Sequence, residues 1–552
     1  MKDWHSWLEI FVLLSVLISL AIPLGTYIAK VYQGQVLWID KIVHPIEFTF
    51  YKISGINFLE QMTWKSYAQS VVSLGFVSFL LLYALLRLQY YLPLNPQHYL
   101  GVQPDLAFNM AISFLTNTNW QSYEGEKVLS YFSQMMGLSV QNFISAGTGM
   151  AVAVALVRGF SQSGGLSLGN FWVDLTRGVF YILLPLSIIM SILLISQGVI
   201  QNFNDYLTLP SIELSASPQV IPGGPVASQV SIKQLGSNGG GFFSANSAHP
   251  FENPTPFSNF LELLAILLIP VSFIVAYGRM VGQPRQSRAL LGLLFCIFMI
   301  GFLFCAYQEV NYEGKEYRHG ILNSVLWTVA STATSNGSSN ALIESFTPLT
   351  EMSALLFMLT GEVVFGGVGQ GLYSLILYIL ITVFVAGLMS GRMPEYLGKK
   401  IEVFEIKMSL LAILIPALSI LIFVSVAVQL SMAHQSSLTE WLYHFASTTS
   451  NNGSALSALK TNTSCLNTLF GLTMLLGRYG VIIPVLAISG SLMLKRKAKE
   501  EGKAIQNRSV IETDTIVFMI LVFGVIGIVA LLSFFPVVLM GPIADYLSGV
   551  KN

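Results

Sequence analysis

Ten long apolar runs constrain the fold of this chain more than any other feature of its sequence. Each run is about 20 residues long or longer and nearly free of charge, which is the length that an α-helix needs to cross the hydrocarbon core of a bilayer. Hydrophobic residues make up 53% of the 552 positions and charged residues only 10%. The sequence therefore predicts an all-α, multi-pass membrane protein. The runs lie near residues 10–28, 66–86, 128–157, 178–200, 257–278, 289–307, 353–391, 408–430, 464–494 and 515–540.

Basic residues are concentrated in alternate connections between these runs. Because loops rich in Lys and Arg stay in the cytoplasm, this pattern predicts that both termini lie outside. The net charge of zero argues against a nucleic-acid partner. The basic connections contain Lys30, Lys41, Lys52 and Lys65; Arg158 and Arg177; Arg279, Arg285 and Arg288; Arg392, Lys399, Lys400 and Lys407; and Lys495, Arg496, Lys497, Lys499, Lys503 and Arg508. A long polar stretch, about 201–236, is predicted to be an external cap.

Four external connections contain similar polar clusters, which indicates an internal repeat. The clusters read FLTNTNWQSY (114–123), QLGSNGGGFF (234–243), ASTATSNGSSNAL (330–342) and ASTTSNNGSAL (446–456), and they place Asn119, Gly239, Gly337 and Gly453 at equivalent positions. Copies that cannot bury themselves singly pack around a shared centre. We therefore expect four helix, pore loop, helix units around a central ion filter, with one extra helix at each end. The predicted divisions are 1–65, 66–170 (repeat 1), 171–288 (repeat 2), 289–407 (repeat 3), 408–510 (repeat 4) and 511–552.

The chemistry of the four loops favours a monovalent cation. A half-helix before each loop, near 103–115, 226–236, 322–334 and 438–450, would point the negative end of its dipole toward the axis. Gly, and next to it Asn, allows the backbone to turn its carbonyls inward. Rings of carbonyls replace the hydration shell of K⁺, whereas Mg²⁺ and Ca²⁺ prefer carboxylates. A phosphate-binding loop is less consistent with the sequence, because it lacks a GxxxxGK[ST] motif.

Two further features lie at membrane depth. The stretch GEVVFGGVGQG (361–371) interrupts an apolar run and is predicted to unwind it beneath the third loop, although close helix packing is an alternative role for its glycines. Arg478 would limit K⁺ passage along the axis or pair with a carboxylate, or it would bind a partner at the lipid face. Glu362, Asp174 and Glu262 lie near predicted helix ends, where snorkelling or capping accounts for them.

The motifs TNTNWQSY, GSNGGGFFSANSAHPFENPTPFSN, ESFTPL, GEVVFGGVGQGLY and NNGSALSAL together resemble those of KdpA, the family of potassium-binding A subunits of Kdp-type potassium-transporting ATPases. The resemblance covers residues 4 to 545 and places the chain in the superfamily of K⁺ transporters. It implies that Gln121 and Arg478 support the filter and the ion path, to which the unwound stretch adds Gly366, Gly367 and Gly369. The third loop departs from the family pattern, because Asn336 stands where Cys is common. The K⁺ selectivity filter implied by the resemblance consists of Asn117, Thr118, Asn119, Ser237, Asn238, Gly239, Ser335, Asn336, Gly337, Asn451, Asn452 and Gly453.

The resemblance also implies partners and a location. The chain would be a non-catalytic subunit in a bacterial inner membrane and would bind K⁺ as its substrate ion, with no covalent cofactor. It would pass K⁺ through an intramembrane tunnel to a P-type ATPase B subunit, which alone uses ATP, and it would assemble with accessory C and small F subunits. Uphill transport requires such a partner, since no DKTG-type phosphorylation motif is present in this chain. The alternative is a potential-driven transporter of the Trk/Ktr type. A membrane enzyme built on His249 and Glu252 is disfavoured, because His249-Pro250 is typical of a structural corner.

Overall fold

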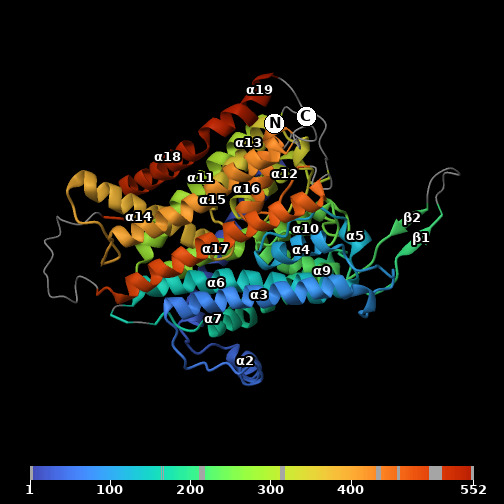
Figure 1. Cartoon of the computed structure of the whole chain (residues 1–552), viewed down its shortest axis with the longest axis horizontal. Helices are drawn as coiled ribbons and strands as arrows, with labels where there is room; N and C mark the ends of the chain where they lie inside the picture. Colours follow the sequence, from blue (N-terminus) through green and yellow to red (C-terminus); the bar gives the residue numbers. More distant parts are fainter. Residues whose placement is uncertain are drawn as a thin grey trace.

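The computed structural model describes residues 4–162, 164–165, 167–210, 218–310, 318–430, 437–456, 461–496 and 512–548. Within these residues, ten helices are long and apolar enough to cross a membrane, which confirms the predicted number of spans. The long helices run in roughly a common direction and form one bundle (Figure 1). Four of the predicted cytoplasmic basic residues, Lys497, Lys499, Lys503 and Arg508, lie outside the described residues.

The spans between the first and the last helix form four units of the same order: an outer helix, a short pore helix and an inner helix. The first contains α3 (Trp64–Leu88), α4 (Pro104–Leu115) and α6 (Val140–Ser161), which a π-helical turn, η2 (Ser133–Ser139), precedes. The second contains α7 (Phe171–Arg177), η3 (Gly178–Leu183) and α8 (Leu184–Ser196) as one span, then α9 (Val226–Leu235) and α10 (Pro256–Met280). The third contains α11 (Pro284–Glu309), α12 (Ile321–Ala333), α13 (Pro348–Leu359) and α14 (Gln370–Ser390), and the fourth contains α15 (Val403–Gln429), α16 (Leu438–Thr449) and α17 (Ser464–Leu494).

Local sequence explains where many of these helices begin. Proline occupies the first position of α4, α10, α11 and α13, where its missing N–H costs no helical hydrogen bond. Side chains of Thr63, Thr255, Ser437, Thr463 and Thr515 accept a backbone N–H at the starts of α3, α10, α16, α17 and α18.

The inner helices form the interior and the outer helices face lipid. In α10, 94% of the apolar window is buried, and the span of η2 and α6 reaches 78%, whereas α3 reaches only 22%. Exposed large apolar side chains on an outer helix are expected where hydrocarbon replaces water. The four inner helices therefore surround the region in which the four loops meet.

The two extra helices are α1 (Trp4–Tyr32) and α18 (Ile516–Val538), which continues through η9 (Leu539–Ile543) into α19 (Ala544–Ser548). Near the chain ends, Asn323 of α12 donates to Glu9 over 2.9 Å and Thr439 of α16 donates to Asp545. The described ends of the chain therefore lie at the same end of the bundle as the starts of the pore helices, consistent with the neighbouring N and C labels in Figure 1.

Several smaller elements were not predicted. The helix α2 (Asp40–Ser54) lies beside the bundle, fixed by Glu47, which accepts from Tyr51 and Tyr181 and pairs with Arg177. The strands β1 (Leu207–Leu209) and β2 (Gln219–Ile221) form an exposed antiparallel hairpin that extends away from the bundle (Figure 1). The stretch 201–236 was expected to form an external cap, but its strands Leu207–Leu209 and Gln219–Ile221 are exposed and do not cover the bundle. Short elements are η1 (Gln89–Tyr91), α5 (Gly125–Val128), η4 (Asn246–Ala248), η5 (Ile343–Ser345), β3 (Glu395–Tyr396) and β4 (Lys399–Lys400).

Candidate functional site

The four pore helices end directly before the four predicted filter tripeptides. Helix α4 ends at Leu115, α9 at Leu235, α12 at Ala333 and α16 at Thr449, each within two residues of its tripeptide. None of the nine tripeptide residues other than glycine exposes more than 4% of its surface. The sequence therefore brings four irregular backbone segments into the interior of a membrane bundle, where such backbone is tolerated only if it is buried or lines a cavity.

The tripeptides share one backbone conformation. In each, the first and third residues have positive φ and the middle residue does not. The φ values are 68° and 51° at Asn117 and Asn119, 48° and 78° at Ser237 and Gly239, 51° and 81° at Ser335 and Gly337, and 56° and 93° at Asn451 and Gly453. Left-handed φ at the first and third positions turns the backbone twice within three residues, which explains Gly at three of the four third positions and Asn at Asn117, Asn119 and Asn451.

Each glycine of the ring approaches a carbonyl of the following repeat. An added Cβ would lie 1.5 Å from the Asn336 oxygen at Gly239, 1.9 Å from the Asn452 oxygen at Gly337, and 2.0 Å from the Thr118 oxygen at Gly453. A side chain at these positions would therefore occupy the place of a neighbouring carbonyl. The contacts run from the second repeat to the third, from the third to the fourth, and from the fourth to the first.

Among the described residues, the carbonyls of the four middle residues accept no hydrogen bond. The amides of Asn238, Asn336 and Asn452 donate to the residue five positions earlier in the pore helix, over 2.8 to 2.9 Å, and Thr118 does the same. In contrast, no hydrogen bond among the described residues ends on the carbonyl oxygen of any of these four residues. Because buried carbonyls without a partner are costly, these oxygens require a ligand that the protein itself does not supply.

Side-chain amides link each loop to its neighbours. Asn336 donates to the Lys233 carbonyl over 3.1 Å, and Asn452 donates to the Ser331 carbonyl over 3.0 Å. The bond from Asn117 to the Ser237 carbonyl, 2.8 Å, joins the first repeat to the second, and that from Asn451 to Thr118, 2.9 Å, joins the fourth to the first. The four tripeptides and the pore helices before them thus form a closed ring of hydrogen-bonded neighbours.

The first loop differs from the others, and the second loop compensates for it. Its third residue is Asn119, which keeps a side chain and donates to Asn142 of α6 over 2.9 Å. A Cβ on Gly240 would lie 2.6 Å from the Cβ of Asn119, so Gly240 provides room for this side chain. Gln121 donates to the Gly241 carbonyl and accepts from the Gly241 amide, both over 2.9 Å. Gln121 therefore joins the first two loops directly behind the ring.

Sequence analysis missed a buried ion pair behind the second loop. Lys233 of α9 is fully buried and pairs with Glu252. His249 meets Glu252 only through the backbone, where its carbonyl accepts the Glu252 amide over 3.0 Å, and its ring Nδ1 accepts the amide of Phe251 over 3.1 Å. Burial lowers the pKa of His249, and its ring stacks on Phe243 with centroids 4.0 Å apart, as expected of a structural corner. The signal available in the sequence was Lys233 itself, the one basic residue in the external connection 201–235.

Beneath the ring, the third inner helix is interrupted. It ends at Leu359 and resumes at Gln370, and the segment between has positive φ at Gly361, Glu362, Phe365, Gly366 and Gly369. A Cβ on Gly367 would lie 3.8 Å from the Thr334 carbonyl, directly before the third tripeptide. A Cβ on Gly369 would lie 2.4 Å from the Gly149 carbonyl of α6. These glycines therefore both interrupt the helix and allow neighbouring backbone to pack closely, so both roles that the sequence suggested apply.

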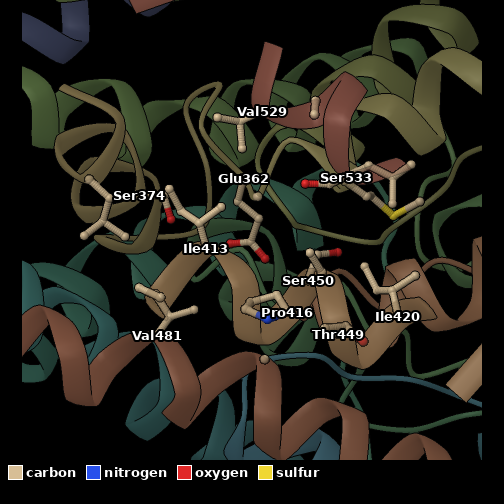
Figure 2. Close-up of a pocket in the computed structure, with 18 of the residues that line it drawn as sticks. Glu362, Ser374, Ile413, Pro416, Ile420, Thr449, Ser450, Val481, Val529 and Ser533 are labelled. Atoms are coloured by element: carbon tan, nitrogen blue, oxygen red, sulfur yellow. The ribbon is translucent and has the colours of Figure 1, made fainter. Parts of the chain in front are cut away.

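A cavity opens beside this interrupted segment. It has a volume of about 50 Å³, room for a few water molecules, and α13, α14, α15, α16, α17 and α18 contribute to its walls. Figure 2 shows the Glu362 side chain directed into it, among Pro416, Thr449 and Ser450. Glu362 is only 2% exposed, and its Oε1 has no hydrogen-bond partner among the described residues. A buried carboxylate with a free oxygen in a small cavity is suited to a cation.

Three acidic residues that were expected near helix ends are interior, so snorkelling and capping are the wrong explanations for them. Glu362, Asp174 and Glu262 are each at most 2% exposed. Asp174 forms a two-point ion pair with Arg158 at 2.5 and 2.7 Å, and Glu262 accepts from Gln234 and Ser247, both over 2.8 Å. Each carboxylate has buried partners or a cavity instead of a route to water.

Arg478 lies between inner helices and is 3% exposed, so it does not face lipid. Its guanidinium donates to Gln370 at the start of α14 and, over 2.9 Å, to the Ser145 carbonyl of α6. A Cβ on Gly149 would lie 3.3 Å from this guanidinium, which places it beside the interrupted segment. A fixed buried cation in this position opposes the passage of another cation.

Comparison with known proteins relates this geometry to a family. Residues 11–547 match the family model described as the potassium-transporting ATPase A subunit. A potassium-transporting ATPase potassium-binding subunit of Sorangium cellulosum is 47% identical, with 97% of each chain covered. The protein of the same name from Clostridium perfringens is 45% identical, again over 97% of each chain.

A solved structure with a similar fold is the potassium transporter TrkH from Vibrio parahaemolyticus. It aligns with a TM-score of 0.54 at 15% identity and covers 84% of this chain and 97% of that one. At this identity the similarity concerns the fold alone.

Proposed function

The chain belongs to the family of potassium-transporting ATPase A subunits, and we propose that its four-loop ring is the filter that selects K⁺ for the pump. As a member of that family it is a potassium-binding subunit of the Kdp-type ATPase and is itself non-catalytic. ATP is hydrolysed by a partner, because a channel-like chain alone only lets K⁺ equilibrate with the membrane potential, which is worth about 2.3 kcal/mol per charge and 100 mV.

The observation that carries the proposal is the set of four free carbonyls. Thr118, Asn238, Asn336 and Asn452 occupy the same position in four loops of the same conformation, and their oxygens accept no hydrogen bond from the described protein. Carbonyl dipoles arranged in this way replace the hydration shell of a monovalent cation. The four pore helices direct their negative ends toward the same place and add to the attraction.

Below the filter, we propose that the ion leaves sideways instead of passing straight through the protein. Arg478 occupies the interior beside the interrupted helix, and its fixed charge opposes movement past it. The cavity around Glu362 offers a carboxylate in the direction of α15 and α18 (Figure 2). A K⁺ ion that enters this cavity would continue through an intramembrane tunnel to a P-type ATPase subunit bound at that side.

The proposed orientation places the starts of the pore helices and both termini on the external side of a bacterial inner membrane. It is supported by the basic residues Arg158, Arg177 and Arg279 at the other ends of the spans. The proposed assembly contains the ATPase B subunit, an accessory C subunit and a small F subunit.

Expression of the chain together with its partners, followed by purification, tests the proposal. We expect a P-type ATPase to copurify and its ATP hydrolysis to depend on K⁺. Gly239→Asp, which puts a side chain and a charge where the Asn336 carbonyl lies, is expected to change the K⁺ and Rb⁺ concentrations that give half-maximal activity. Unchanged values would remove the second loop from the filter, and a chain that is isolated alone and conducts K⁺ passively in liposomes would instead indicate a Trk/Ktr-type transporter.

A further inference from the structure

In the second loop, and in no other loop as far as the chain is described, a side chain holds the carbonyl of the third residue. Asn246 donates from Nδ2 to the Gly239 carbonyl over 2.6 Å. No hydrogen bond among the described residues ends on the corresponding carbonyls of Asn119, Gly337 and Gly453. The ring is therefore asymmetric where the second repeat meets the external side.

Asn246 is itself held by a buried cation. Its Oδ1 accepts from the Lys233 ammonium over 2.7 Å and from the Ser247 amide over 2.8 Å. Asn246 has a φ of 55°, a conformation that Asn tolerates better than other residues with a side chain. The left-handed turn at Asn246 thus places its side-chain oxygen against the Lys233 ammonium and its side-chain nitrogen against the Gly239 carbonyl.

Lys233 contacts Gly239 from both directions. Its own carbonyl accepts the Gly239 amide over 3.1 Å and the Asn238 amide over 2.9 Å, and it also accepts from Asn336 of the next repeat. Its ammonium reaches the Gly239 carbonyl through Asn246. One residue of the pore helix therefore determines the position of the amide and of the carbonyl of the same ring glycine.

Glu252 neutralises this cation. Its Oε2 accepts from the Lys233 ammonium, and its Oε1 accepts the Phe243 amide over 2.9 Å. A Cβ on Gly241 would lie 2.8 Å from Oε1, so this glycine provides space for the carboxylate. Without Glu252, a buried positive charge next to the ring would repel the ion that the ring attracts.

We propose that Lys233, Glu252 and Asn246 form a positioning relay that fixes the Gly239 carbonyl and thereby sets the affinity and selectivity of the filter for K⁺. The proposal rests on the proposed function of the ring. Hydrogen bonds to an ionised group are stronger than neutral ones, and a chain of them polarises each member, so the ammonium makes the Asn246 amide a better donor to Gly239. A carbonyl held by such a donor is less free to move outward and make room for a larger ion.

The test uses the complete complex, purified with its partner subunits, and measures ATP hydrolysis against K⁺ and Rb⁺ concentration. Asn246→Ala is expected to raise the K⁺ concentration for half-maximal activity about three- to tenfold, the equivalent of one hydrogen bond, and to change the ratio of the K⁺ and Rb⁺ values while the maximal rate is retained. Asn246→Ser replaces it if the alanine variant does not assemble, because serine is too short to reach Lys233 and Gly239 together. The matched control is Ser244→Ala in the same loop, which loses a bond to Glu126 and touches no ring residue.

Comparing a variant that leaves the Lys233 charge unpaired with one that removes both charges tests whether Lys233 and Glu252 act on the ring electrostatically or only support folding. Glu252→Gln leaves the Lys233 charge without its partner and is expected to weaken K⁺ activation more than the double variant Lys233→Met with Glu252→Gln, which removes both charges. If Asn246→Ala leaves the half-maximal concentrations unchanged while Gly239→Asp shifts them, the relay is refuted and the filter stands. If neither variant shifts them, the filter itself fails. A loss of maximal rate or of assembly alone, in both Asn246 variants, would assign these residues to folding and overturn the proposal.

Discussion

Replacement of Gly337 by alanine tests the ring contact between the third and fourth repeats. Gly337 has a φ of 81°, and an added Cβ would lie 1.9 Å from the Asn452 oxygen and 2.8 Å from its carbon. Carbon and oxygen atoms in contact are normally about 3.3 Å apart or more, so the oxygen would have to move by about 1.4 Å. That oxygen is one of the four free carbonyls of the proposed filter.

The expected loss of K⁺ affinity follows from the conformational energy that the variant needs to bring the ring back to its ion-binding geometry. A residue with a side chain pays about 1–2 kcal/mol in the left-handed region. If the backbone at residue 337 relaxes in the empty ring and must return to left-handed φ when K⁺ binds, this energy is subtracted from the free energy of K⁺ binding. We therefore expect the K⁺ concentration for half-maximal ATP hydrolysis to rise about 5- to 30-fold.

The assay is K⁺-dependent ATP hydrolysis by the purified complex, and Gly292→Ala is the matched control. Gly292 lies in α11, has no atom within 4 Å of an added Cβ, and is therefore expected to leave K⁺ activation unchanged. An unchanged K⁺ dependence in Gly337→Ala, in a complex that assembles normally, would refute the inference that the Asn452 carbonyl coordinates the ion.

Three further substitutions address the residues around the ring. Arg478→Gln removes the buried charge beside the interrupted helix, and we expect a passive K⁺ leak in liposomes without ATP; a membrane as tight as wild type would show that Arg478 does not limit the axial path. Glu362→Gln keeps the shape of the side chain but removes its charge, and we expect the maximal K⁺-dependent rate to fall at least tenfold. A loss of about 1.4 kcal/mol of ion stabilisation corresponds to that factor. A full rate would exclude the cavity from the ion path. Asp174→Ala removes the ion-pair partner of Arg158, and we expect it to lower the free energy of unfolding by about 3–5 kcal/mol, measured as a lower thermal stability of the solubilised protein. The control is Lys127→Ala, which breaks an exposed ion pair and is expected to have no measurable effect on stability.

Hydropathy and glycine chemistry together made much of this architecture predictable. Long apolar runs report membrane spans directly, and the four pore helices begin and end within two residues of the predicted half-helices. The interruption between Leu359 and Gln370 coincides with the glycine-rich stretch that indicated it. These features depend on local sequence, which explains why they can be inferred from one chain.

Pairwise contacts between distant segments were not predictable in the same way. Glu262 and Asp174 looked like residues near helix ends, yet each is buried against a partner that another segment supplies. Lys233 gave no local signal beyond its charge, because Glu252 and Asn246 reach it only after the chain has turned back past the ring. The helix α2 was also missed, because its residues do not form an apolar run of membrane-spanning length.

The glycine contacts of the ring all point the same way around it. Each third-position residue is restricted by the repeat that follows, and at the one place where a side chain replaces glycine, Asn119, the following repeat supplies the extra glycine, Gly240. The four loops therefore constrain one another's evolution in sequence order. A single repeat exchanged with that of a relative should conflict with its neighbour, whereas an exchange that carries the interacting loops together should be accepted. The four repeats are similar in fold, but the contacts between successive loops of the ring mean that one repeat cannot replace another.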